Sequence, residues 1–203
     1  MPVFNLSEDN INRLREKFYE FQNSREKIHK LIKNYVADYR QFEGAAEDRQ
    51  EFLEEKYSKL APSLSHLVMF EDSEIYFHVQ DIMAILGRTQ PAISITISKL
   101  EKSEGYGAKL LALRKPFKSA NNNKIFIYKQ EIFDLIIDKY EEEYLLRFSQ
   151  PRRGSSEAAP DFNEVKKFWD YLKEFENYKN SHAIINNKEN KIELPDIPAM
   201  KIR

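Results

Sequence analysis

Residues 89–102 bring polar and basic side chains together at the spacing of one helix face. Ile93, Ile97 and Leu100 recur at steps of four and three residues, which is the spacing of an apolar stripe that faces a core. At about 100° per residue, the other positions of such a helix turn away from that core. The candidate binding residues of this stretch are Thr89, Gln90, Ser94, Ile95, Ser98, Lys99 and Lys102.

The types of these side chains match the hydrogen-bonding groups of DNA. Gln90 stands at the start of the expected helix, where its amide could pair with adenine. Ser94 and Ser98 could bind either a base edge or a phosphate oxygen. Lys99 and Lys102 suit phosphate, because an ammonium group acts as a point charge. The pattern therefore predicts a helix that enters the major groove.

The charge distribution agrees with this prediction. The whole chain has a formal net charge of −1, so there is no global basic signature. The segment Glu74–Gln130 nevertheless contains nine basic and four acidic residues, a local net charge of +5. A local basic surface is what a phosphate backbone would require, although an ordinary solvated face has the same composition.

Two short helices joined by a tight turn would position these side chains. The first, Asp81–Leu86, has apolar residues at helical spacing and stops at Gly87. Glycine suits a left-handed position just past a helix end. Thr89 can cap the next helix, and Pro91 is tolerated in its first turn. Helix, short turn and helix form the helix-turn-helix pattern.

The segment Gly87–Glu101 resembles the turn and recognition helix of bacterial helix-turn-helix and winged-helix regulators. Residues 89–94, Thr-Gln-Pro-Ala-Ile-Ser, are especially similar to the form found in LysR- and MarR-like repressors. Two residues depart from the pattern: Met83 stands where these families usually have a small alanine, and Arg88 where they usually have an apolar residue. The resemblance implies DNA binding and a β-hairpin wing after the second helix.

Ile95 stands where resembling repressors often carry an arginine that reads guanine. An isoleucine offers only apolar contact, for example with a thymine methyl group. It could equally be a buried contact with protein, and both interpretations remain open. The sequence therefore predicts modest or A·T-leaning specificity.

A β-hairpin is expected directly after the second motif helix. Lys109–Phe117 and Ile125–Tyr128 have strand composition, and the asparagine-rich residues 118–124 between them are typical of a turn. This hairpin would be the wing that the resemblance implies. Its turn supplies the candidate DNA-binding residues Lys118, Asn122 and Lys124. Plain turn chemistry explains the asparagines equally well.

Residues 7–42 are expected to form one long helix, capped by Ser7. Arg25 is the one polar residue in a stripe that otherwise consists of Ile11, Leu14, Phe18, Phe21, Ile28, Ile32, Tyr35, Tyr39 and Phe42. A second helix, residues 45–60, would fold back on the first as a helical hairpin. The long stripe must be covered, either within this molecule or as a homodimer seam.

The carboxyl-terminal part is expected to contain two more helices. One covers residues 130–148, with an acidic outer face that includes a solvated run at Glu141–Glu143, and the other covers residues 161–178. Residues 150–160 have linker composition, and their pair Arg152-Arg153 is either a minor-groove arm or simply solvated. Residues 180–203 are polar and are expected to be irregular.

Composition narrows the function classes. The chain has 203 residues, of which 41% are hydrophobic and 32% charged, and its mean hydropathy is −0.66. It contains no cysteine, its four histidines are scattered, and it has no phosphate-binding or nucleophile motif. We therefore expect no catalytic residue, metal or cofactor, and a protein that is not an enzyme. Neither a leader nor a membrane-spanning run is expected, which is consistent with a cytoplasmic protein.

The sequence thus predicts a mainly α protein with a winged helix-turn-helix, a small antiparallel β-hairpin, a long N-terminal helical hairpin and a C-terminal helix. The expected segments are residues 1–62, 63–149, 150–160 and 161–203. The favoured function is a DNA-binding transcriptional regulator that acts on double-stranded DNA. A homodimer is expected, with residues 7–42 as one candidate for the contact between the protomers. The alternatives are a winged-helix scaffold that binds protein, or a plasmid or phage replication or partition protein.

Overall fold

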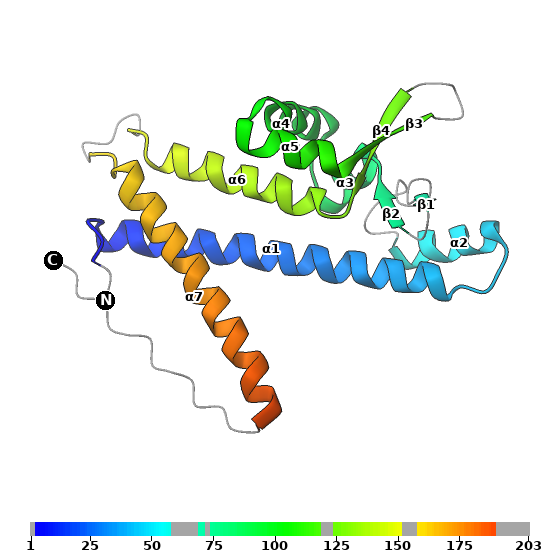
Figure 1. Ribbon diagram of the computed structural model, residues 1–203, viewed down its shortest axis with the longest axis horizontal. Coiled ribbons are helices and arrows are strands. Elements are labelled where there is room, and N and C mark those ends of the chain that lie inside the picture. Colours follow the sequence, from blue (N-terminus) through cyan, green and yellow to red (C-terminus); the bar gives the residue numbers. More distant parts are fainter. Residues whose placement is uncertain (1–2, 58–68, 72–73, 119–123, 152–157, 190–203) are drawn as a thin grey trace. The chain divides into compact units, whose positions relative to one another are not determined.

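The computed structural model describes residues 3–57, 69–71, 74–118, 124–151 and 158–189 (Figure 1). It confirms a mainly helical protein with a small antiparallel sheet. In the described part of the chain the elements are, in order, α1 (Glu8–Gln41), α2 (Ala46–Tyr57), β1 (Met69–Glu71), β2 (Glu74–Phe77), α3 (Val79–Leu86), α4 (Gln90–Lys102), α5 (Glu104–Leu113), β3 (Arg114–Lys118), β4 (Lys124–Lys129), α6 (Ile132–Phe148) and α7 (Phe162–Glu189).

The chain forms two compact units. The first contains Met1–Gln22 and Glu141–Arg203, and the second contains Asn23–Tyr140. Each unit therefore holds part of α1 and part of α6. These units follow from contacts between residues, whereas the predicted segments follow from composition. The two divisions therefore differ in kind, and the boundaries at residues 62, 149 and 160 stay a prediction.

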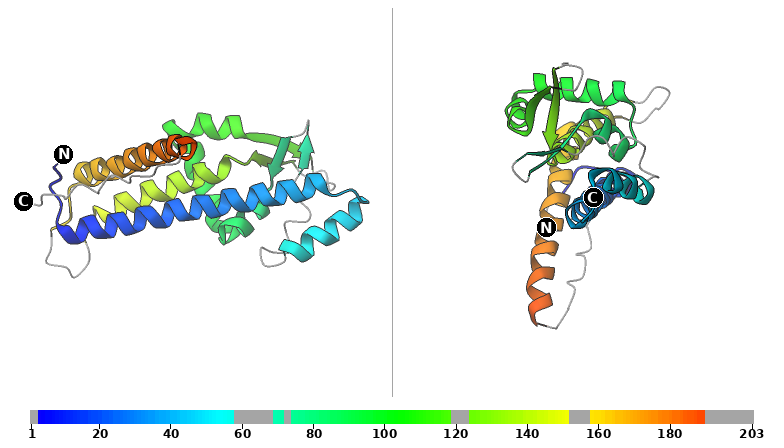
Figure 2. Two further views of the ribbon diagram at one scale, coloured as in Figure 1. Left: turned by 90° about the horizontal axis from the view of Figure 1, so that it is seen from below. Right: turned by 90° about the vertical axis from the view of Figure 1, so that its right-hand side faces the viewer.

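The long N-terminal helix is confirmed. α1 is one unbroken helix, seen along its length in the left view of Figure 2, and the Asn10 backbone N–H donates to the Ser7 hydroxyl at 3.3 Å. Two acidic residues lie in the first turn, where the helix dipole favours them. Six of the nine apolar stripe residues are buried in the single chain: Ile11, Leu14, Phe18, Ile28, Ile32 and Tyr35. Intrachain packing therefore covers most of the stripe, as the first of the two interpretations predicted.

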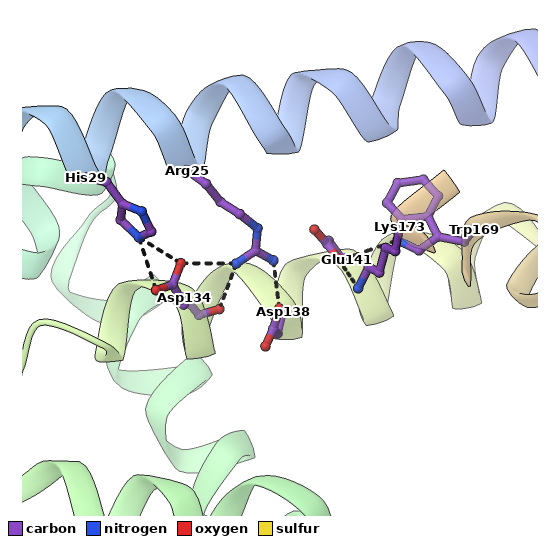
Figure 3. Close-up of polar contacts among 7 residues, drawn as sticks. All are labelled: Arg25, His29, Asp134, Asp138, Glu141, Trp169 and Lys173. Atoms are coloured by element: carbon purple, nitrogen blue, oxygen red, sulfur yellow. Dashed lines mark hydrogen bonds and ion pairs between the residues drawn. The ribbon is translucent and has the colours of Figure 1, made fainter. Parts of the chain in front are cut away.

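The first unit has an aromatic core around Trp169, which is 1% exposed. The Phe18 ring meets the indole edge to face, with ring centroids 5.3 Å apart. The Trp169 indole N–H donates to Glu141 Oε2 at 3.4 Å, and Lys173 Nζ lies 2.7 Å from the same oxygen (Figure 3). Glu141 is only 2% exposed, so the prediction that it lies on a solvated face was wrong. A carboxylate can be buried here because an ammonium group and an indole N–H both bind it.

In the second unit, the polar residue of the α1 stripe pairs with α6. The Arg25 guanidinium lies 3.3 Å from Asp134 and 2.7 Å from Asp138 (Figure 3). His29 Nε2 lies 3.0 Å from the Asp134 carboxylate as well. Asp134 and Asp138 belong to the acidic outer face that the sequence predicted, but Arg25 and His29 of α1 bind them. The arginine in the stripe therefore replaces an apolar contact with a charged one.

The end of α1 and α2 form the expected hairpin within the second unit. Tyr35 of α1 and Tyr57 of α2 are buried, with ring centroids 5.2 Å apart. The Tyr57 hydroxyl donates to Asp38, which also pairs with Lys56 at 2.7 Å. The expected end of the second helix at Leu60 lies outside the described residues.

The sheet is antiparallel throughout, with strand order β1-β2-β4-β3. The strand at residues 69–71, β1, was not predicted. Residues 109–117 were expected to form one strand, which was wrong for 109–113: α5 continues to Leu113, and β3 begins at Arg114. Lys-Leu-Leu-Ala-Leu is a run of strong helix formers, and this preference prevails.

The two glycines of α5, Gly105 and Gly107, are both helical. A Cβ at Gly107 would lie 3.0 Å from the Glu101 carbonyl oxygen. Glycine therefore permits a close approach of α5 to the end of α4, rather than a break.

The last helix is longer than expected. α7 runs to Glu189, so the prediction of an irregular tail from residue 180 was wrong for residues 180–189. No proline or glycine interrupts the sequence before Pro195, which explains why the helix continues. The rest of the tail and the pair Arg152-Arg153 lie outside the described residues. None of the described helices combines the length and the apolar composition that crossing a membrane would require.

Candidate nucleic-acid interface

The turn between α3 and α4 has the predicted geometry. Gly87 adopts φ +60° and ψ +38°, the left-handed conformation. The Gly87 N–H donates to the Ala84 carbonyl at 3.3 Å, and the Arg88 N–H to the Met83 carbonyl at 3.0 Å. These bonds close the end of α3 and satisfy its last carbonyls. The two residues that follow then lead directly into α4.

The start of α3 is fixed by a capping box that sequence analysis missed. The His78 N–H donates to Asp81 Oδ2 at 2.8 Å, and the Gln80 N–H donates to His78 Nδ1 at 3.3 Å. Asp81 is fully buried, and its Oδ1 has no hydrogen-bond partner among the residues that the structure describes. Burial raises the pKa of Asp81 to about 8, against the lowering effect of the bond from His78. The usual serine or threonine signal is absent here, because a histidine occupies the N-cap.

The core side of α4 is largely as predicted. Ile93 and Leu100 are fully buried, and Ile97 is partly buried. Thr96 is also buried and donates its hydroxyl hydrogen to the Ala92 carbonyl at 2.9 Å, so it belongs to the core side. Thr89 is the N-cap residue, but its side chain makes no capping bond, which leaves its hydroxyl group outside the helix hydrogen bonds.

The opposite side of α4 carries every predicted contact residue of this helix and its cap. All of these side chains are exposed: Thr89, Gln90, Ser94, Ile95, Ser98, Lys99 and Lys102. Ile95 is 56% exposed, so this chain does not cover it. Both predicted roles of Ile95, contact with a thymine methyl group and contact with another protein, therefore stay open.

The β-hairpin places two predicted cations directly across from each other. In the register of β3 and β4, Lys118 pairs with Lys124, and both side chains are exposed. Asn122 lies outside the described residues, as do its neighbours in the turn. The hairpin part of the predicted site is therefore described only at its two lysines.

Not all of the local positive charge is available to a ligand. Arg114 pairs with Glu101 at 2.8 Å, and Lys129 pairs with Glu74 at 2.9 Å. The Arg88 guanidinium lies 5.6 Å from the centre of the Tyr140 ring. The exposed basic side chains of the segment are Arg88, Lys99, Lys102, Lys109, Lys118 and Lys124.

One exposed aromatic residue beside these cations was not predicted. Phe126 of β4 is 42% exposed, and the Arg114 guanidinium lies 4.5 Å from its ring centre. In the sequence, Phe126 stands between Ile125 and Ile127 in an unbroken apolar run. Such a run does not show which of its residues face the solvent, so the exposure of Phe126 could not be predicted from it.

A cleft of about 640 Å³ also lies in the second unit, between α1, β2 and the start of α6. Its lining carries both signs of charge, with Lys33, Arg40 and Lys129 against Glu74, Glu131 and Asp134. Lys129 lies 2.9 Å from Glu74, and His29 lies 3.0 Å from Asp134. Across the described ranges, no group of three or more His, Cys, Asp and Glu side chains could hold a metal ion. The cleft therefore offers no charge of one sign to a ligand.

Comparison of the chain with protein-family models, with curated proteins and with solved structures gives no match.

Proposed function

We propose that the protein binds double-stranded DNA, with α4 in the major groove and the β3–β4 hairpin on the backbone. The observation that carries this proposal is the exposed side of α4. Seven residues chosen for their DNA chemistry all lie on it, and the helix begins two residues after a turn held by Gly87.

In the proposed complex, each exposed residue of α4 and of the hairpin has a contact that suits its side chain. Gln90 is exposed at the start of α4, the part of a recognition helix that approaches base edges. Ser94 and Ser98 follow on the exposed side of α4, with Ile95 between them. Lys99 and the hairpin lysines would hold phosphates, which set affinity rather than sequence preference. Without an arginine on this side of α4, discrimination of bases would be modest and lean toward A·T.

The proposed fold of this part is a winged helix that contains an extra helix. A helix-turn-helix and a hairpin support it, while α5 between α4 and β3 departs from the pattern that the resemblance implied. The ion pair between Glu101 of α4 and Arg114 of β3 ties the hairpin to the recognition helix despite this insertion.

The proposed biological role is transcriptional regulation by a homodimer, because two-fold pairing doubles the length of the DNA site. Plasmid or phage replication or partition would use the same surface. The proposed activity is binding without catalysis, in line with the composition of the exposed side of α4.

A second candidate function is a scaffold that binds protein, and the exposed Ile95 favours it. The near-neutral chain and an acidic outer face on α6 would also suit a scaffold. The argument from α6 is weaker, because Asp134 and Asp138 pair with Arg25, and Glu141 is buried.

The test is fluorescence anisotropy on a labelled random duplex pool with Lys99→Ala/Lys124→Ala. The matched control is Lys27→Ala/Lys30→Ala, which removes the same charge from exposed positions of α1. We expect the first variant to bind about tenfold or more weakly and the control to bind like the unmodified protein. Equal loss in both variants, or no binding by the unmodified protein at low salt, would contradict DNA binding by α4 and the hairpin.

A further inference from the structure

One face of the β3–β4 hairpin combines an exposed aromatic ring with cations. Residues directly opposite in an antiparallel pair share a face. The register pairs on this face, here called the Phe126 face, are Arg114 with Tyr128, Pro116 with Phe126, and Lys118 with Lys124. From the base of the hairpin to its tip, the face therefore runs from a buried tyrosine through an exposed phenylalanine to two lysines.

The Phe126 ring is held in place by the recognition helix. Its partner, the Arg114 guanidinium, lies 4.5 Å from the ring centre and is 2.8 Å from Glu101 at the end of α4. The Arg114 side chain is only 17% exposed, so it has a fixed position. Phe126 itself is 42% exposed. An immobilised ring that remains open to solvent loses little conformational entropy when it binds a ligand.

The charge on the hairpin indicates an anionic ligand. β3 and β4 contain five basic residues and no acidic residue. Two of the basic residues, Lys118 and Lys124, lie directly opposite each other, and like charges in this arrangement destabilise a hairpin. A chain of phosphates along this face would remove that repulsion.

We infer that the Phe126 face binds single-stranded DNA, with an unpaired base stacked on Phe126 and its phosphates on Lys118 and Lys124. An aromatic ring next to a row of cations is the arrangement that binds single strands, since every base has a face that can stack. In an intact duplex the neighbouring base pairs already cover that face. The inference rests on the proposed function and refines it: the preferred site is a duplex with unpaired bases beside the part that α4 contacts.

The experiment compares three labelled DNA probes of one sequence: a blunt duplex, a forked duplex with an unpaired end, and a single strand. We expect the unmodified protein to bind the forked duplex about tenfold more tightly than the blunt one, given the strength of base–aromatic stacking. Phe126→Ala should abolish this preference and leave binding to the blunt duplex unchanged. Phe126→Trp, which keeps an aromatic face, should retain the preference.

A fluorescent base analogue placed at the unpaired position reports stacking directly. Its emission should be quenched on binding to the unmodified protein and to Phe126→Trp, but not to Phe126→Ala. Equal affinity of the unmodified protein for forked and blunt duplexes would overturn the inference. An unchanged preference for the forked duplex in Phe126→Ala would do the same, because the ring would then not be its source.

The same probes separate this inference from the proposed function. Binding to the blunt duplex without a preference for the fork retains the proposed function and overturns the inference. Binding to the single strand alone, lost in Phe126→Ala, overturns the proposed function and retains the Phe126 face. No binding to any probe overturns both. Tighter binding of a single-stranded RNA of the same sequence would overturn the assignment to DNA.

Discussion

At the scale of single residues, folding strongly changes the pKa of the Asp81 carboxyl. The carboxyl is fully buried at the start of α3, one oxygen accepts from the His78 N–H, and the other has no partner in the described part of the chain. Burial raises the pKa to about 8 from an ordinary value of 3.8. Between about pH 4 and pH 8 the folded carboxyl is therefore protonated while the unfolded one is ionised.

Unfolding in this window releases a proton, so the free energy of unfolding must fall as the pH rises. The stabilisation is complete below about pH 4 and is lost by about pH 8. We expect Asp81→Asn, which keeps an acceptor for His78 but does not titrate, to remove this part of the pH dependence, a few kcal/mol at most. Urea unfolding at pH 5 and pH 8 measures the difference. The same loss of stability in both proteins would show that Asp81 is not its source.

The residue scale also shows what the sequence could and could not reveal about the site. Gly87 and the exposed positions of α4 follow from local rules, a left-handed cap and a helical period, and the structure has them as predicted. Phe126 could not be found in this way. Its exposure depends on which face of the hairpin is covered by other elements, and an apolar run contains no such information.

At the scale of elements, Glu141 joins α6 to α7 within the first unit. It is 2% exposed and binds the Trp169 indole N–H and the Lys173 ammonium group. The sequence placed it in a run of three glutamates, which normally indicates a solvated face. The partners come from α7, more than 25 residues later in the chain, so local periodicity could not predict the burial.

Removal of this acceptor should destabilise the first unit. We expect Glu141→Ala to lower the free energy of unfolding by about 1–3 kcal/mol, because a buried N–H and an ammonium group lose their partner. Glu141→Gln keeps an oxygen and should cost less. Denaturant unfolding followed by the fluorescence of Trp169, the one tryptophan in the chain, measures both. The control is Glu174→Ala at an exposed position of α7, and equal effects of all three changes would contradict this role.

Helices and strands whose residues have a strong local conformational preference could be predicted from the sequence. The bounds of those that depend on tertiary contacts were predicted less well. The bounds of α1 and α4 follow from caps and apolar spacing. The strand expected at residues 109–117 was wrong at its start, because helix-forming residues extend α5 to Leu113. The prediction that the tail is irregular from residue 180 was wrong for residues 180–189, because polar composition alone does not end a helix.

At the scale of the whole molecule, the central claim concerns electrostatics. A chain of net charge −1 can bind DNA only if its basic side chains are gathered on one surface. In the proposed function, the exposed lysines of α4 and of the hairpin would form this surface. Affinity for DNA should therefore depend on a few identifiable lysines.

The most direct measurement is the affinity for duplex DNA across a series of salt concentrations, for the unmodified protein and for Lys99→Ala/Lys124→Ala. Each lost phosphate contact should reduce the slope of log affinity against log salt by about 0.9. We predict a steep slope for the unmodified protein and a slope shallower by about 2 for the variant. A flat dependence on salt, or identical slopes for the two proteins, would contradict the claim that α4 and the hairpin bind the DNA backbone.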